Sequence, residues 1–358
     1  MNQSLIFIPD ISGFTQFVQT TEAEHSQHVI AELLEILINA NTQNLKLAEV
    51  EGDALFFFAD GRVPSQEKIL AQIETMFTAF YSHLELLKKH RICPCNACAS
   101  APNLDLKIIL HCGELQFLQV QGNHKPFGNV VIESHRLLKN SVDSDQYVLI
   151  SSDLANHIGM PDNYSSKLFN FKVGHDEYDQ KDIRYLFSEI STDALQLRPF
   201  EMHPVDNLPD KPNLTYEFNF DVSAQKVYET ITNFKFRPKW VKGVDHFEYN
   251  PNEVNRVGSE HVCVINEKHL NFKTVTKPGE PGQLVYGELT ESIPIADELY
   301  QFYLIRHIDD STCAVKIETY WRSKSLFKKL MMAIAGKKEF QKNIMNGMSD
   351  LKIYLEGA

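Results

Sequence analysis

Hydrophobic and polar positions divide the chain into a first half of mixed strands and helices and a second half rich in strands. In the first half, apolar residues at helical spacing predict a helix over about 22–40 and a longer one carrying Ile69 to Leu87. Short apolar runs predict strands at 5–9, 45–50, 54–59, 104–111, 114–120 and 147–150. We expect 104–111 and 114–120 to pair as a hairpin at Gly113. Pro9 argues against a central position for the first strand, since proline donates no hydrogen bond.

In the second half, an alternating strand begins at Leu214, and a helix follows it. Several strands between 246 and 321 precede a long amphipathic helix over 324–355. A curved antiparallel sheet wrapped around the last helix is the natural packing for this order. The stretch 192–213 contains four prolines and little periodicity, which is typical of a linker. We therefore predict domains at 1–191 and 213–358, joined by a linker at 192–212.

Composition narrows the function classes. The chain has 358 residues and a net charge of −12, which disfavours non-specific binding to nucleic acid or to an anionic membrane. The N-terminal segment lacks a signal-peptide pattern, and no apolar stretch has the length of a membrane span. We expect a cytoplasmic protein whose six cysteines are thiols or metal ligands.

Two carboxylates stand out in the first half. Asp10 ends the first predicted strand, and Asp53 starts the third. If these strands pair, the two carboxylates become neighbours and call for a hard divalent cation, Mg²⁺ or Mn²⁺. The turn at 11–15 leads into a helix, and its backbone N–H groups can cradle a triphosphate. Its candidate phosphate-binding residues are Ile11, Gly13, Phe14 and Thr15.

Three ordered motifs resemble the catalytic domain of class III nucleotidyl cyclases, in a divergent and uncharacterised branch. They are Pro9–Thr15, Glu49–Ala54 and Leu106–Glu114, the last with a His-x-Gly-Glu end. The resemblance implies an α+β fold with a ferredoxin-like βαββαβ core. It also implies a homodimer that converts a nucleoside triphosphate to a cyclic nucleotide and pyrophosphate.

The resemblance assigns further roles, with some departures. Asp10 and Asp53 would hold two metal ions, and Arg136 would steady the transition state. Glu49 and Lys125 fall at the two base-selecting positions, and Lys181 at a phosphate-binding lysine. Where the family has an asparagine that orients the ribose, this chain has Ile132.

A second interpretation is a cyclase fold that has lost its activity. In that case Asp10 and Asp53 persist as cap or turn residues. Glu49 and Lys125 would face each other across the family's dimer interface, and an ion pair between them would fill the base pocket. The first domain would then bind nucleotide without turnover, or serve only for dimerisation.

A cysteine cluster follows the long helix. Cys93, Cys95 and Cys98 lie within six positions, with His90 next to them and Cys112 as another candidate ligand. These donors suit a structural Zn²⁺ ion, although the spacing is not a standard pair of CxxC motifs. Three reduced cysteines in a polar loop remain the alternative. The histidines at 25 and 28 are interpreted as part of a solvated helix face.

The second half resembles the START-like, polyketide-cyclase-related (SRPBCC) superfamily. The resemblance rests on the order of elements, on the segment Arg237–Val244 with its Trp240, and on Gly258. It implies a helix-grip fold with an apolar cavity for a hydrophobic small molecule. Expected wall residues are Tyr249, Val264, Phe272, Tyr286, Phe302 and Trp321. We see no catalytic set in this domain, although His261 and Glu288 could pair across strands.

Overall fold

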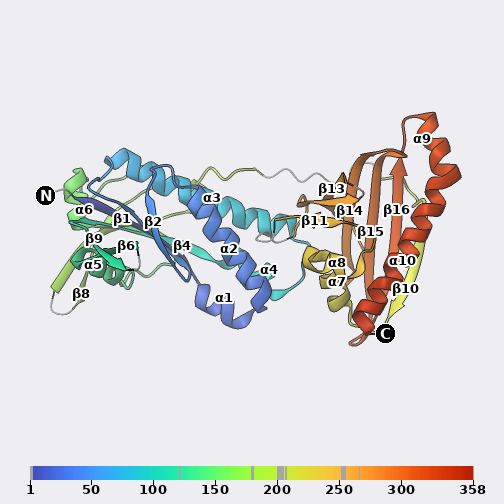
Figure 1. Cartoon of the computed structure of the whole chain (residues 1–358). Coiled ribbons are helices and arrows are strands. Elements are labelled where there is room, and N and C mark those ends of the chain that lie inside the picture. Colours follow the sequence, from blue (N-terminus) through green and yellow to red (C-terminus); the bar gives the residue numbers. More distant parts are fainter. Residues whose placement is uncertain are drawn as a thin grey trace. The chain divides into compact units, whose positions relative to one another are not determined.

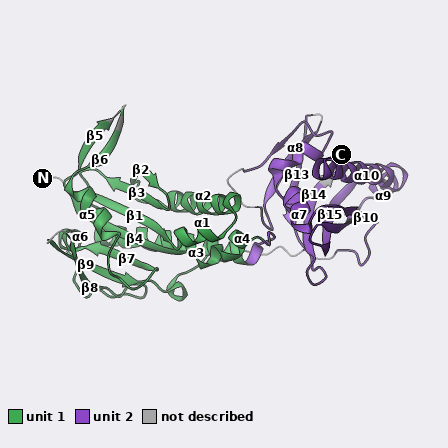
Figure 2. Ribbon diagram, turned by 90° about the horizontal axis from the view of Figure 1, so that it is seen from below, with its two compact units in different colours: residues 1–88, 95–200 green, residues 89–94, 201–358 purple. Residues whose placement is uncertain are grey.

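The structure is a computed structural model that describes residues 3–120, 122–178, 181–199, 205, 208–250, 255–265 and 267–357. The chain divides into two compact units, which are residues 1–88 with 95–200 and residues 89–94 with 201–358 (Figure 2). The division at 200/201 falls inside the predicted linker, whereas the sequence did not predict the grouping of 89–94 with the second unit. Each unit combines a large sheet with helices, so both are α+β.

The first unit begins with a ferredoxin-like core (Figure 1). Its sheet has the order β2-β3-β1-β4, and the neighbouring strands in that order are antiparallel. The elements of this core are β1 (Ser4–Ser12), α1 (Phe14–Thr20), α2 (Ala23–Asn39), β2 (Lys46–Glu51), β3 (Ala54–Ala59), α3 (Gln66–His90) and β4 (Asp105–Gly113). With α1 and α2 together between β1 and β2, and α3 between β3 and β4, the order is the βαββαβ order that the cyclase resemblance implied.

Further elements extend this sheet beyond β4. β7 pairs with β4 in parallel, and β9 and β8 complete the order β4-β7-β9-β8. The remaining elements of this unit are α4 (Asn96–Ser100), β5 (Gln116–Val120), β6 (Asn123–Phe127), α5 (Asn129–Leu137), β7 (Tyr147–Ser151), α6 (Ser152–Ile158), β8 (Lys172–Tyr178) and β9 (Lys181–Glu189), with short 3₁₀ turns at Ala101–Asn103 and Thr192–Ala194.

Two strand predictions were wrong. β1 lies between β3 and β4, although Pro9 argued against a central strand. Pro9 pairs with Ile108 of β4, while the assigned pairs between β1 and β3 skip Ile8 and Pro9 and resume at Asp10. Burial of the strand on both faces thus outweighs one missing hydrogen bond. The predicted partner of β4 was also wrong, because β5 pairs with β6 in a separate two-stranded sheet.

One face of the first sheet positions most of the candidate residues. Ile6 and Ile8 of β1 pack with Val130 and Leu137 of α5 in a single buried cluster. Because side chains alternate between the two faces of a strand, Asp10 lies on the same face as Ile6 and Ile8. This face, next to α5, is called the α5 face below.

The second unit is a helix-grip fold. Its seven-stranded antiparallel sheet has the order β10-β16-β15-β14-β13-β12-β11, so the first strand lies beside the last. Buried residues of α7 and α10 pack with Tyr286 and Ile317 of the sheet. The strands are β10 (Leu214–Phe220), β11 (His246–Glu248), β12 (Glu260–Ile265), β13 (Lys268–Val275), β14 (Leu284–Ile293), β15 (Ala296–Asp309) and β16 (Thr312–Arg322). The helices are α7 (Ala224–Thr232), α8 (Arg237–Trp240), α9 (Leu326–Met331) and α10 (Lys337–Glu356), with a 3₁₀ turn at Phe234–Phe236 and a π-helical turn at Met332–Gly336.

Candidate functional sites

Asp10, near the end of β1, and Asp53, directly before β3, are neighbours. Asp10 lies opposite Ala54 in the strand ladder, and the Ile11 N–H donates to the Asp53 carbonyl at 3.1 Å. Burial raises the pKa of the Asp53 carboxyl, and the charge of Asp10 raises it further. The Lys107 ammonium lies 3.2 Å from an Asp10 oxygen. Its charge also lowers the pKa of Asp53, so Lys107 offsets the charge of both carboxylates.

The turn predicted to bind phosphate, residues 11–15, comes directly after Asp10 in the sequence. The Ile11 side chain is buried in β1, while Gly13 and Thr15 are exposed and Phe14 is half-buried. Gly13 has a φ of +84°, in the left-handed region that favours glycine, and it precedes α1. The exposed part of this turn is thus Gly13 and Thr15.

Glu49 and Lys125 form an ion pair in which the ammonium lies 2.7 Å from the carboxylate. The prediction placed these residues across a dimer interface, but the pair forms between β2 and β6 of one chain. The Lys125 hydrogen bond lowers the pKa of Glu49 against an opposing effect of burial. Glu49 is paired opposite Phe56, whose side chain belongs to the cluster on the α5 face.

The helix α5 carries two more of the predicted positions, Ile132 and Arg136. Ile132 is half-exposed, and Arg136 lies in the last turn of the helix. His135 stacks on Phe56 with ring centroids 5.6 Å apart. Its Nδ1 atom is 3.7 Å from Glu51. The stack fixes α5 over β3.

A cavity of about 870 Å³ lies beside α5 and contains a cluster that the sequence reasoning did not single out as a site. Its lining includes His111, Glu133 and Asp153, whose ligand atoms lie within 4.8 Å of one another. His111 Nδ1 is 2.8 Å from the Ser151 hydroxyl, and its Nε2 is 3.3 Å from Glu133. Burial lowers the pKa of His111, and Glu133 opposes that shift.

Two of the predicted site residues lie at this cavity or contact its lining, namely Ile132 and Lys181. The Lys181 ammonium contacts Glu133, so it is paired with a carboxylate in this structure. Ile132 also lines the cavity, whereas Asp10 and Asp53 are not among its described lining residues. The only signal for this cluster in the sequence was the His-x-Gly-Glu motif that ends β4.

The cysteine cluster has a histidine neighbour that sequence reasoning missed. His25 Nδ1 lies 3.0 Å from Cys95 Sγ and 3.8 Å from Cys98 Sγ. The interpretation of His25 as part of a solvated helix face was therefore wrong, since its ring points toward these thiols. The two other suggested ligands lie elsewhere: His90 Nδ1 is 3.3 Å from the Val257 carbonyl, and Cys112 lies in β4.

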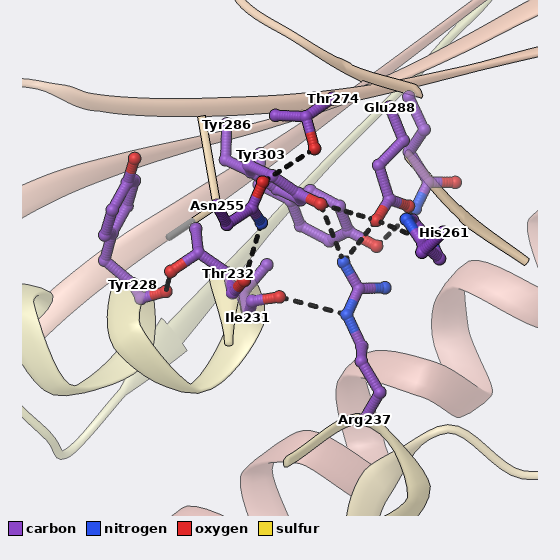
Figure 3. A network of polar contacts seen from close by, with 11 residues as sticks. Tyr228, Ile231, Thr232, Arg237, Asn255, His261, Thr274, Tyr286, Glu288 and Tyr303 are labelled. Atoms are coloured by element: carbon purple, nitrogen blue, oxygen red, sulfur yellow. Dashed lines mark hydrogen bonds and ion pairs between the residues drawn. The ribbon is translucent and has the colours of Figure 1, made fainter. Parts of the chain in front are cut away.

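The second unit contains a buried ionic network (Figure 3). Arg237, at the start of α8, contacts the Glu288 carboxylate of β14, and both residues are buried. The guanidinium also donates to the Ile231 carbonyl at 3.0 Å and to the Tyr286 hydroxyl at 3.3 Å. Tyr286 in turn donates to Glu288 at 2.7 Å. Arg237 and Tyr286 are members of this network that the sequence did not reveal.

His261 extends this network. Its Nε2 lies 3.7 Å from Glu288, as the sequence suggested when it placed the two residues on separate strands. Burial lowers the pKa of His261 to about 4, against the opposing charge of Glu288. Burial alone would raise the pKa of Glu288, but Arg237 first, and then His261, outweigh it and hold that pKa below its ordinary value. Both ring nitrogens of His261 lack a hydrogen-bond partner among the described residues.

Of the predicted cavity walls, Trp321 lines a cavity, whereas Tyr286 and Phe302 belong to packed clusters. Tyr286 belongs to the cluster between the sheet and α10, but Phe302 belongs to a cluster on the other face of the sheet. Phe302 pairs with Gly287, the residue after Tyr286, and neighbouring residues of a strand point to opposite faces of the sheet. A separate cavity of about 310 Å³ lies beside Trp321 and Met332.

Comparisons with known proteins give partial matches to the chain. A family model described as "Protein of unknown function (DUF2652)" matches residues 30–147. The uncharacterized protein Rv2561/Rv2562 of Mycobacterium tuberculosis (strain ATCC 25618 / H37Rv) is 36% identical over 126 residues. That match covers 35% of this chain and 58% of the relative, so the chain spans little more than half of the relative's length.

Solved structures match parts of the chain at low identity. The monomeric guanylyl cyclase domain of the RhoGC fusion protein from the aquatic fungus Blastocladiella emersonii is 17% identical with a TM-score of 0.37, covering 52% of this chain and 94% of that one. The di-domain ARO/CYC BexL from the BE-7585A biosynthetic pathway is 14% identical with a TM-score of 0.34, covering 40% of this chain and 46% of that one. At such values, each fold assignment rests on the strand order of its own unit. Among the described residues, no helix combines the length and the apolar character needed to cross a membrane.

Proposed function

We propose that the first unit binds a divalent cation together with the phosphates of a nucleoside triphosphate, and converts that nucleotide to a cyclic nucleotide and pyrophosphate. The observation that carries the proposal is that Asp10, opposite Ala54 in the strand ladder, lies close enough to Asp53 for its charge to raise the pKa of Asp53, with Lys107 as a nearby counter-charge. Carboxylate oxygens are the donors that Mg²⁺ and Mn²⁺ prefer. A divalent ion at Asp10 would displace the Lys107 ammonium and relieve the repulsion between the carboxylates.

The residues of the chain have distinct roles in this proposal. Asp10 and Asp53 hold the metal, which supplies charge stabilisation at the reacting phosphate when it is bound. The exposed backbone at Gly13 lets phosphate oxygens approach closely. Arg136 would act on a nucleotide held by a second copy of the chain, as the cyclase resemblance implies. Ile132 offers no hydrogen bond to the ribose, so we expect turnover to be slow.

The test joins metal binding to turnover. Mn²⁺ binding is measured by electron paramagnetic resonance for the wild type, Asp10→Asn and Asp53→Asn. Cyclic product from ATP, GTP, CTP and UTP is then measured by mass spectrometry. Asp60→Asn is the matched control, because Asp60 is exposed just beyond the opposite end of β3.

We expect both signals in the wild type and in Asp60→Asn, and neither signal in the two site variants. Mn²⁺ and nucleotide binding without product would overturn the cyclisation step and leave a nucleotide-binding module. Absence of Mn²⁺ binding in the wild type would overturn the whole proposal for this unit.

A second function is favoured by an observation in the second unit. The cavity beside Trp321 and Met332 combines apolar walls with the polar side chains of Ser323, Lys329 and Lys337, which is typical of a small-molecule site. We propose that this unit binds a hydrophobic small molecule. The probe is 1-anilinonaphthalene-8-sulfonate, whose fluorescence should rise with wild-type protein and fall after Met332→Trp fills the cavity. Equal fluorescence with both proteins would contradict the proposal.

A further inference from the structure

We propose that Cys93, Cys95, Cys98 and His25 bind one Zn²⁺ ion. The four ligand atoms, three thiol sulfurs and one imidazole nitrogen, all lie within 4.8 Å of one another. Three thiolates and one histidine are an established ligand set for structural zinc. The set is closed, with four protein ligands, so it leaves no open position for a substrate.

The distances around His25 fit a tetrahedral ion. Zinc–sulfur bonds of about 2.3 Å and zinc–nitrogen bonds of about 2.0 Å place tetrahedral ligands roughly 3.5–3.8 Å apart. His25 Nδ1 lies 3.0 Å from Cys95 Sγ and 3.8 Å from Cys98 Sγ. These separations bracket the required value, so zinc needs movements of less than about 1 Å. Cys93 precedes Cys95 by two residues, and the chain itself therefore holds the third thiol near the others.

Contacts that do not involve the metal already hold the two sides of the site together. Glu22 is the N-cap residue of α2, three positions before His25. Its two carboxylate oxygens accept hydrogen bonds from the backbone N–H groups of Asn96, at 3.1 Å, and Ala97, at 2.9 Å. Glu22 thus fastens the start of α2 to the start of α4, between Cys95 and Cys98. It is a positioning residue for the His25 ring.

The backbone also holds the sulfur of Cys95 in place. The N–H group of Cys98 donates to Cys95 Sγ at 3.4 Å, so Cys95 caps α4 through its sulfur. On binding zinc, each thiol loses its proton to solvent, and His25 binds as the neutral imidazole.

The site has a structural purpose in the connection that follows α3. It closes the connection between α3 and β4 onto the first turn of α2, a connection that contains only the short helix α4 and a 3₁₀ turn. All three cysteines are buried, and His25 is half-buried. We therefore expect the ion to stabilise this connection rather than to take part in the chemistry at Asp10 and Asp53.

The experiment measures metal content in the full chain, expressed with added zinc and purified without chelator. Mass spectrometry of the metal should give about one zinc per wild-type chain. The apoprotein titrated with Co²⁺ should show the intense visible bands of a tetrahedral site and thiolate-to-metal charge transfer. Chelator competition should show zinc affinity reduced on the order of 100-fold or more in His25→Ala and Cys95→Ser.

Matched controls separate ligation from a general loss of folding. His28→Ala lies one turn further along α2, and Cys112→Ser removes a buried thiol outside the cluster, so both should keep wild-type zinc affinity. His25→Cys should restore binding that His25→Ala loses, because it supplies a fourth thiolate. Glu22→Ala should weaken binding about 10- to 100-fold, and Glu22→Gln should restore most of it.

Two outcomes would overturn the proposal. One is wild-type protein that carries little zinc and gives no tetrahedral Co²⁺ bands. The other is His25→Ala with wild-type zinc affinity, which would remove His25 from the site. If the cysteine variants fail to fold, the wild-type Co²⁺ spectrum and the pair His25→Ala and His25→Cys still decide the question.

Discussion

The Lys125 ammonium lies 2.7 Å from a Glu49 carboxylate oxygen, and the two residues come from β6 and β2 of one chain. Both side chains are well exposed, at 54% for Lys125 and 38% for Glu49, so water screens the pair. The pair occupies the two positions to which the cyclase resemblance assigns base selection. A nucleotide base that binds there must therefore compete with an ion pair that the chain makes by itself.

Removing Lys125 should release Glu49. In Lys125→Met, we expect the pKa of Glu49 to rise toward its ordinary value, because the hydrogen bond from Lys125 is the main cause of its depression. Carbon-13 NMR titration of the glutamate carboxyls measures this directly. Lys172→Met, which removes the exposed pair with Glu189, is the control and should leave Glu49 unchanged. A Glu49 titration that does not move would contradict the assigned contact.

Removing Lys107 should strengthen divalent-metal binding. The Lys107 ammonium lies 3.2 Å from Asp10 and lowers the pKa of Asp53. In Lys107→Met, we expect Mn²⁺ affinity to rise about tenfold, since the ion no longer displaces an ammonium. We also expect the Asp53 pKa to rise further in the metal-free variant. Mn²⁺ affinity that falls instead would mean that Lys107 supports the ligand rather than competing with it.

Breaking the buried pair in the second unit should cost more stability than any exposed pair. Arg237→Met leaves Glu288 buried without its cation, and we expect a loss of about 3–5 kcal/mol in unfolding free energy. Combining it with Glu288→Leu should recover most of that loss, because no buried charge remains. Urea unfolding followed by tryptophan fluorescence reports on this unit, since both tryptophans, Trp240 and Trp321, belong to it.

The matched control for that experiment is Arg306→Met. Arg306 is exposed and lies 3.8 Å from Glu217 in the same unit, so its loss should change stability by about 1 kcal/mol or less. Equal losses of unfolding free energy in Arg237→Met and Arg306→Met would show that the buried network stabilises the unit no more than an exposed ion pair does.

Protonation of His261 should destabilise the second unit in mild acid. Its pKa is about 4 in the folded protein and near 6.5 in an unfolded chain. Between these values the unfolded state binds a proton that the folded state does not, so stability falls as the pH is lowered from 6.5 toward 4. The contribution is at most about 3 kcal/mol.

Tryptophan-monitored urea unfolding between pH 7 and pH 5 tests this prediction. His261→Gln should flatten the pH dependence, while His307→Gln, at an exposed position, should leave it unchanged. Identical pH profiles for the wild type and His261→Gln would show that His261 is not responsible.

The local pattern of the sequence was sufficient for most elements, and the family resemblances implied both fold types. Apolar spacing predicted α2 and α3, because that period follows directly from helix geometry, while short apolar runs and alternation predicted the strands. The motifs around Asp10 and Asp53 likewise indicated two neighbouring carboxylates, since β1 and β3 pair in the βαββαβ order.

Tertiary structure decided what the local pattern leaves open. Pro9 lies in a central strand because burial on both faces outweighs one lost hydrogen bond. His25 meets Cys95, which is 70 residues further along the chain, and Arg237 meets Glu288 across 51 residues. Such pairings depend on how helices dock and on how strands align, and no periodicity within one element encodes them. The sequence by itself therefore determined which elements form and which residues carry chemistry, whereas packing determined which of those residues lie together.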